Sequence, residues 1–269
     1  MVEQQQPIIS YCTPVLNEEI FLPFYLENLT YSTIPVELVI TDGGSTDKTV
    51  ELIEEFTIAH PDIHINFKYA PQEGKPYTDD WNEHEVRNDL LQRCKGQFIV
   101  LADSDEIIEP KDVKQIITEM NINKHTLAYM KFIPFWETLK KVRLNGLTDP
   151  RWFGLEIGRI IKNNCYEYNN KAHHCGLIPI IDHISTSKFN YPVYHLHYGF
   201  GQAGLKPGDN RRAELLDPEL NISMYAVPDI IDNPDFSDKC WTTDVGWILN
   251  VKTEEWKGPW PKCLTHLIN

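Results

Sequence analysis

Short apolar runs alternate with amphipathic patterns between residues 8 and 120 of the chain. Apolar, β-branched runs predict strands, and apolar residues that recur every three or four positions predict helices. The predicted strands are Ile8–Tyr11, Val36–Ile40, Ile63–Tyr69 and Gln97–Ala102. The predicted helices are Glu18–Leu29, a helix that Ser45 caps, Trp81–Cys94 and a helix that begins at Pro110. Because the strands are apolar throughout rather than alternating, they predict an α/β fold with a largely parallel sheet.

The pattern loosens after residue 122. Strands are predicted at Thr126–Phe132 and Arg159–Lys162, and the sequence beyond Leu196 is irregular and rich in Pro, Gly, Asp and Trp. We therefore expect one domain with two halves. These halves are residues 1–122 and residues 123–269, and the second includes a C-terminal extension.

Three of the predicted strands end in polar clusters, at Thr13–Glu18, Asp42–Asp47 and Asp103–Glu106. Ligands of open parallel sheets bind at the carboxyl ends of the strands, so these clusters should converge on one edge. In an extended backbone Asp103 and Asp105 would point the same way. Two convergent carboxylates repel each other unless a cation lies between them, and Mg²⁺ or Mn²⁺ prefers oxygen ligands. The pair predicts a metal that holds a phosphate-bearing substrate.

Other residues near this edge suit a nucleotide. The Asp42 carboxylate could accept a hydrogen bond from a base imide, and Lys75 and Arg87 could balance phosphate charge. Asn17 and Glu18 are expected to open a helix whose first N–H groups would face a polar ligand. Each residue also has a purely structural explanation. Asn17 could simply cap the helix, and Arg87 could simply pair with a surface carboxylate.

Composition narrows the function classes. The formal net charge of −14 disfavours a broad nucleic-acid-binding face. The cysteines are scattered and none forms a Cys-x-x-Cys pair, which favours reduced thiols and a cytoplasmic location. No apolar run approaches the length of a membrane helix, so we expect no membrane span.

Three blocks of the chain resemble the family 2 glycosyltransferases of the GT-A fold. They are PIISYCTPVLNEE, ELVITDGGSTDKTVELIEEF and VRNDLLQRCKGQFIVLADSDE, within residues 7–120. The resemblance implies a Rossmann-like, mostly parallel sheet flanked by helices, with a smaller irregular acceptor-side part. It makes residues 1–122 the nucleotide-sugar-binding half and residues 123–269 the acceptor-side half of the same domain. It also implies a hexosyltransferase type of reaction, in which a sugar moves from a nucleotide-sugar, usually a UDP-sugar, with inversion at the anomeric carbon.

The resemblance assigns roles to individual residues. The first block and Asp42 would hold the nucleoside, Arg87 would lie near the donor, and Asp103 and Asp105 would bind the metal and diphosphate. The family more often has Asp-Asp-Gly-Ser where this chain has Asp42-Gly43-Gly44-Ser45, so only Asp42 carries over. The candidate nucleotide-sugar-binding residues are Thr13, Pro14, Asn17, Glu18, Asp42, Lys75, Arg87, Asp103 and Ser104.

The general base is less clearly marked. Arg159–His174 resembles the family segment that ends in a His-Glu pair, but this chain has His173-His174 there. The base is therefore either His174, since histidine can accept a proton near neutral pH, or a carboxylate. The carboxylate candidates are Asp149, Glu156 and Asp182.

Two late histidines, His195 and His197, are two residues apart in an apparent strand. In related enzymes a late histidine completes the metal site, so either is a ligand candidate for Mn²⁺ or Mg²⁺. The alternative is that both pack against Tyr191, Tyr194 and Tyr198.

Two other functions compete with sugar transfer. A nucleotidyltransferase also places a carboxylate pair and a metal under a parallel sheet, and a degenerate nucleotide-sugar-binding protein would explain the missing glutamate. The acceptor hydroxyl could belong to a glycan, a protein or a modified nucleobase.

Overall fold

A computed structural model describes residues 8–71, 82–144, 154–170, 175–204 and 253–268 of the chain. It divides into two compact units. The first unit comprises residues 1–130 and 157–191, and the second comprises residues 131–156 and 192–269. Residues 157–191, which we assigned to the acceptor-side half, therefore fall in the first unit.

A mostly parallel sheet forms the centre of the first unit, with strand order β8-β4-β1-β2-β3. Strands β4, β1, β2 and β3 are parallel, and β8 is antiparallel to β4. Their bounds are β1 (Ile9–Val15), β2 (Val36–Asp42), β3 (His64–Tyr69), β4 (Phe98–Leu101) and β8 (Glu156–Lys162). The register pairs Val15 of β1 with Asp42 of β2, and Cys12 of β1 with Leu101 of β4. The ends of these three strands therefore lie along one edge.

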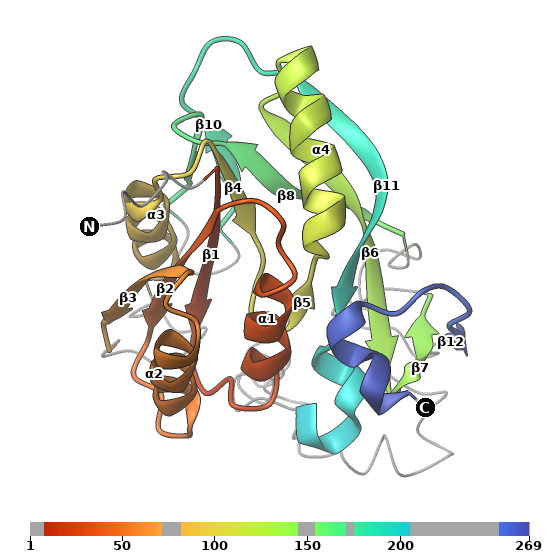
Figure 1. Cartoon of the computed structure of the whole chain (residues 1–269). Coiled ribbons are helices and arrows are strands. Elements are labelled where there is room, and N and C mark those ends of the chain that lie inside the picture. The colour runs from red at the N-terminus through yellow and green to blue at the C-terminus, as the bar shows by residue number, and fades with distance from the viewer. Residues whose placement is uncertain (1–7, 72–81, 145–153, 171–174, 205–252, 269) are drawn as a thin grey trace, which may run out of the picture. The chain divides into compact units, whose positions relative to one another are not determined.

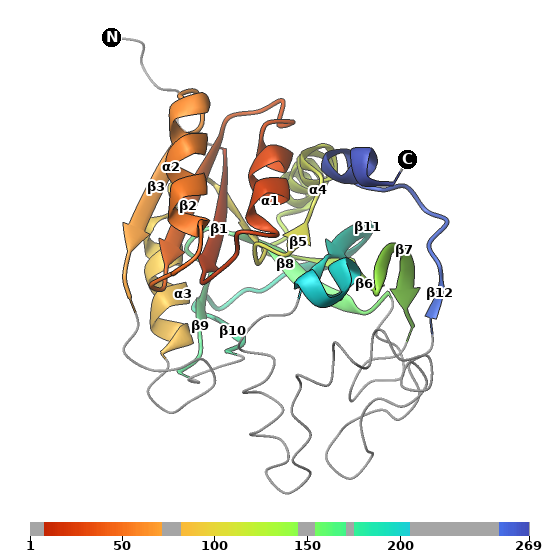
Figure 2. The same cartoon turned by 90° about the horizontal axis from the view of Figure 1, so that it is seen from below.

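Helices cover both faces of this sheet. Figure 2 shows α1 (Leu22–Leu29) and α2 (Thr49–Ala59) on one face and α3 (Glu83–Arg93) on the other. On the α3 face Cys12 and Val39 of the strands pack with Leu90, and all three are almost completely buried. Such burial contributes about 1.5–3 kcal/mol for each large apolar side chain. The first unit also contains α4 (Pro110–Asn123), the short strand β5 (Glu106–Ile107) and the antiparallel pair β9 (Tyr166–Tyr168) and β10 (Leu177–Pro179).

The second unit is built on antiparallel strands in the order β12-β7-β6. Their bounds are β6 (Leu127–Trp136), β7 (Thr138–Arg143) and β12 (Thr253–Glu255). Strand β11 (Thr186–His195) leads into the 3-10 helix η1 (His197–Gly204), and η3 (Lys262–Leu267) follows β12. Aromatic side chains fill the interior. Tyr194 stacks on Phe135, with ring centroids 6.2 Å apart, and its hydroxyl donates to the Pro259 carbonyl at 2.9 Å.

The structure confirms the predicted fold class and the alternation of strands and helices in residues 8–123. Pro110 occupies the first turn of α4, as expected. Several bounds differ from those predicted, and two of these lie beside the first polar cluster. Strand β1 continues past Tyr11 to Val15, because Thr13 and Val15 are buried and the ladder with β2 continues. Helix α1 begins only at Leu22, with Pro23 in its first turn, where proline is tolerated.

No helix in the described part of the chain is both long and apolar enough to cross a lipid bilayer.

Candidate functional site

The loops after β1 and β2 are joined by hydrogen bonds. The Asn17 N–H donates to Ser45 Oγ at 2.8 Å, and Asn17 Oδ1 accepts the Thr46 N–H at 2.8 Å. The Glu18 N–H donates to Thr49 Oγ1 at 2.7 Å, which ties the first loop to the start of α2. Two of the three polar clusters predicted from the sequence are thus brought together.

This arrangement corrects two expectations. Asn17 and Glu18 do not open α1, because their backbone N–H groups are directed to the second loop and Asn17 has a left-handed φ of 55°. Ser45 does not cap α2, whose N-cap residue is Lys48. Asp47 Oδ1 instead accepts the N–H of Thr49, the first residue of α2, at 2.9 Å. That bond satisfies one of the donors that a helix start leaves open.

The Asp42 carboxylate organises the glycine turn that follows β2. It is fully buried, and its Oδ1 accepts the N–H groups of Gly44 and Ser45 at 2.9 Å each. Its Oδ2 accepts the Ser45 hydroxyl. Gly44 has a φ of 102°, which a residue with a side chain rarely adopts. Asp42 therefore shapes the turn, and its contact with a base remains a prediction.

The Asp-Ser-Asp-Glu segment forms a turn between β4 and β5. The Glu106 N–H donates to the Asp103 carbonyl at 2.9 Å, so the extended backbone expected for Asp103 and Asp105 was wrong. The side chain of Asp103 is 41% exposed, whereas Ser104 and Asp105 are buried. The turn thus offers Asp103 to a ligand and keeps Asp105 close beneath the surface.

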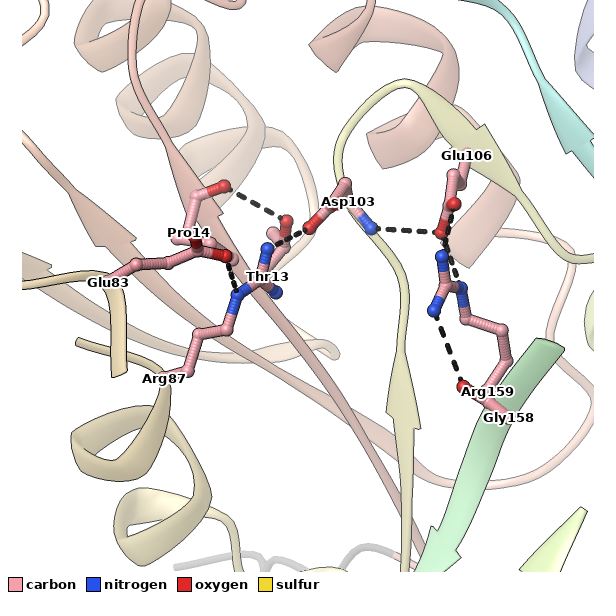
Figure 3. A network of polar contacts seen from close by, with 8 residues as sticks. All are labelled: Thr13, Pro14, Glu83, Arg87, Asp103, Glu106, Gly158 and Arg159. Atoms are coloured by element: carbon pink, nitrogen blue, oxygen red, sulfur yellow. Dashed lines mark hydrogen bonds and ion pairs between the residues drawn. The ribbon is translucent and has the colours of Figure 1, made fainter. Parts of the chain in front are cut away.

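Arg87 of α3 neutralises Asp103, as Figure 3 shows. Its Nη2 lies 2.9 Å from Asp103 Oδ1, and its Nε lies 2.6 Å from Glu83 Oε1. Desolvation is the largest single effect on the pKa of the Asp103 carboxyl and acts to raise it, but the positive charges of Arg87 and Arg159 together hold that pKa below its ordinary value. The negative charge of Asp105 acts to raise the same pKa, because the two carboxylates repel each other. Arg87 therefore both pairs with a carboxylate and adjoins the predicted donor site.

A second arginine, Arg159 of β8, was missed as a site residue. Its Nε and Nη2 donate to the two carboxylate oxygens of Glu106 at 2.7 and 2.5 Å, on the other side of the turn from Arg87 (Figure 3). Burial raises the pKa of Glu106 to about 7, against the lowering effect of Arg159. The two-pronged contact is the geometry of an ionised carboxylate, so we assign a charged pair. The sequence signal that could have revealed this pair is Glu106, the third acidic residue of the motif.

The late histidines lie in the second unit. Strand β11 ends at His195, and His197 begins η1, so the expectation that both lie in one strand was wrong. Their ring centroids are 5.8 Å apart. The His197 ring stacks on Tyr198 at 4.3 Å, and the His195 ring lies 5.0 Å from Phe132. The contact of His197 with Tyr198 agrees with the packing alternative, whereas Tyr194 stacks on Phe135.

The remaining candidates are unevenly placed. Thr13 and Pro14 belong to β1, and the Thr13 hydroxyl donates to the Pro14 carbonyl at 3.2 Å. Glu156 lies in the second unit, where Lys131 contacts it at 3.0 Å, and Asp182 is exposed in the first. Three further candidates lie outside the described residues: Lys75, Asp149 and His174.

Asn17 provides a test of the junction between the two loops. Asn17→Gly removes the acceptor of the Thr46 N–H but suits the left-handed backbone, whereas Asn17→Ala also introduces strain. We expect Asn17→Gly to lower the free energy of unfolding by about 1 kcal/mol, and Asn17→Ala by roughly 1–2 kcal/mol more. Urea unfolding of the purified variants measures both effects.

Asn164 is the matched control, because its φ is 59° and its exposed side chain makes no hydrogen bond that the structure describes. Asn164→Gly should leave stability unchanged or raise it, and Asn164→Ala should show the strain alone. If Asn17→Gly were as stable as the unsubstituted chain, the Asn17–Thr46 bond would not hold the loops together.

Comparison with known proteins adds family evidence to this geometry. The model of "Glycosyl transferase family 2" matches residues 10–179. An uncharacterized glycosyltransferase of Haemophilus influenzae is 33% identical over 103 residues, which cover 38% of this chain and 38% of the relative. The poly(ribitol-phosphate) beta-N-acetylglucosaminyltransferase TarS of Staphylococcus aureus is 27% identical over 108 residues, 39% of this chain and 17% of TarS. The matched segments thus span well under half of these relatives.

Among solved structures, glucosyl-3-phosphoglycerate synthase from Mycobacterium tuberculosis, in complex with Mn²⁺, UDP and glucosyl-3-phosphoglycerate, is similar over part of the chain. Its sequence identity is 23% and its TM-score is 0.34, and the match covers 47% of this chain and 44% of that one. The family assignment depends instead on the sequence match, which extends from β1 through the two loops, the acidic turn and β8 to β10. The chain belongs to glycosyl transferase family 2.

Proposed function

We propose that this chain moves a sugar from a UDP-sugar to a hydroxyl acceptor, with inversion at the anomeric carbon and with Mn²⁺ or Mg²⁺. The observation that carries the proposal is the edge of the first sheet. There the Asp42 turn and the Asp103–Asp105 turn follow strands on either side of β1. The Asp42 turn would bind the nucleoside, and the Asp103–Asp105 turn would bind the diphosphate.

The nucleoside end is built on Asp42 and the joined loops. Asp42 already accepts three hydrogen bonds, from two N–H groups and one hydroxyl. Because this carboxylate is fully buried, we assign its contact with a base imide N–H from the family resemblance alone. Because the Asn17 bonds fix the neighbouring loop, the base would meet a preformed surface, which reduces the ordering cost of binding.

The diphosphate end is built on the acidic turn. Asp103 and Asp105 offer the oxygen ligands that hard divalent cations prefer, and their mutual repulsion favours a cation between them. When bound, such a cation would neutralise charge on the departing diphosphate. Arg87 would supply a further positive charge beside Asp103. We assign the remaining metal ligand to His195 or His197 on the basis of the family resemblance.

The acceptor hydroxyl needs a group that takes its proton. His174, Asp149, Glu156 and Asp182 remain the candidates, and we favour a carboxylate because the family ordinarily uses one. Of these candidates, Glu156 forms an ion pair with Lys131, with Oε1 and Nζ 3.0 Å apart.

The metal assignment is tested with Asp103→Asn and Asp105→Asn. Each substitution keeps the shape of the side chain but removes the charge that attracts the cation. We expect UDP affinity in the presence of Mn²⁺ to fall at least about tenfold, which corresponds to roughly 1.4 kcal/mol. Isothermal titration of UDP with and without Mn²⁺ measures the change.

Asp62→Asn is the control, because Asp62 is an exposed carboxylate of the first unit outside the predicted site. It should bind UDP as the unsubstituted chain does. Unchanged Mn²⁺-dependent affinity in both Asp103→Asn and Asp105→Asn would refute the metal assignment.

The base is tested by a pH–rate profile of the unsubstituted chain and of His174→Ala, Asp149→Ala, Glu156→Ala and Asp182→Ala. With a carboxylate base, turnover should persist below about pH 6.5, where an unperturbed histidine becomes protonated. One carboxylate variant should lose about 10²- to 10⁴-fold in rate while UDP binding is retained.

Glu167→Ala serves as the control, since Glu167 is an exposed carboxylate on β9. A rate that falls as the pH drops through about 6.5, together with loss of turnover in His174→Ala, would assign the base to His174 instead. Full activity in all four candidate variants would mean that the acceptor site lies elsewhere in the chain.

A further inference from the structure

The acidic motif contains a third carboxylate, Glu106, that the proposed metal site does not use. Its side chain is only 3% exposed. Arg159 Nη2 donates to its Oε1 at 2.5 Å, and Arg159 Nε donates to its Oε2 at 2.7 Å. Both oxygens are therefore committed to a guanidinium beneath the surface, and Glu106 is not offered to a ligand as Asp103 is.

Glu106 also closes the turn that carries the two aspartates. Its N–H donates to the Asp103 carbonyl at 2.9 Å, and its Oε2 accepts the Asp103 N–H at 3.4 Å. The second contact is long, but it completes a reciprocal pair around Ser104 and Asp105. The orientation of the Asp103 backbone thus depends on where the Glu106 carboxylate is held (Figure 3).

Arg159 holds that carboxylate from a rigid support. It belongs to β8, where the next two residues, Ile160 and Ile161, are almost completely buried and pair with Val100 and Ile99 of β4. The ladder ends at Ile160, so Arg159 lies beside the point where β4 gives way to the turn. Its third contact, from Nη1 to the Gly158 carbonyl at 3.4 Å, also lies on β8.

Stability alone is a weak reason for such a pair. Desolvating two charges costs about as much as their attraction returns, and apolar side chains of similar volume are often as stabilising. A two-pronged arginine–carboxylate contact provides fixed geometry in addition to energy. In this chain the contact fixes the turn that carries Asp103 and Asp105.

We propose that Glu106 and Arg159 are positioning residues, which lock the Asp103–Asp105 turn to β8 in the orientation that binds the metal–diphosphate group. This inference rests on the proposed function. It assigns the pair no contact with substrate, and it predicts that loss of either residue weakens the metal-dependent part of nucleotide binding and leaves the nucleoside part unchanged.

The test compares Glu106→Gln, Arg159→Met, the double variant and Arg159→Lys in the full chain. The ligands are UDP with Mn²⁺, and uridine without metal. Each single variant should lose roughly tenfold or more in Mn²⁺-dependent UDP affinity, the range typical of groups that orient metal ligands. The double variant should lose no more than the worse single variant, because the two residues act as one unit. Uridine affinity should stay unchanged, and Arg159→Lys should recover part of the loss seen in Arg159→Met.

Asp89→Asn is the matched control, because Asp89 forms another carboxylate–arginine pair in the first unit, with Arg93 at 2.9 Å. It should leave Mn²⁺-dependent UDP affinity unaltered. If Glu106→Gln and Arg159→Met fold and bind UDP with Mn²⁺ as tightly as the unsubstituted chain, the pair is only structural and the inference is wrong. Equal losses for UDP and uridine would also overturn it. If the unsubstituted chain shows no Mn²⁺-dependent UDP binding, the proposed function fails first.

Discussion

Crowding of negative charge at the end of β4 is the constraint on which the site depends. Asp103, Asp105 and Glu106 fall within four residues, and two of them are buried. Two like charges 4 Å apart repel by about 4 kcal/mol at the effective dielectric of a protein surface. Two arginines offset this repulsion, one on each side of the turn: Arg87 from α3 and Arg159 from β8. The two arginines differ in their surroundings, because Arg87 meets a carboxylate that is partly exposed, and Arg159 meets one that is almost fully buried.

The sequence predicted the sheet and its polar edge because both depend on local patterns. Strands that are apolar on both faces must be covered by helices, and parallel strands bring their following loops to one edge. It did not predict how the loops bind one another. The Asn17–Ser45 contact depends on a left-handed backbone at Asn17, which no periodicity reveals. The Glu106–Arg159 pair joins residues 53 apart, and it requires that β8 be added antiparallel beside β4.

The family match covers the two units unequally. The family match ends at residue 179, so most of the first unit lies within it and residues 192–269 of the second unit lie outside it. Residues 205–252 lie outside the described structure, and Asp149 and His174 of the proposed base set do as well. The described residues therefore include more of the proposed donor site than of the proposed acceptor site.

We propose that a UDP-sugar is the substrate of this chain and that its sugar is transferred. The most direct measurement is product analysis after the chain is incubated with Mn²⁺ and a panel of nucleotide-sugars. NMR would follow both the phosphorus products and the anomeric configuration of the sugar. We expect UDP as the nucleotide product from one UDP-sugar, with the sugar released in the inverted configuration. Release of a sugar 1-phosphate would indicate nucleotidyl transfer, and tight UDP-sugar binding with no turnover would indicate a binding protein. Either result would contradict sugar transfer.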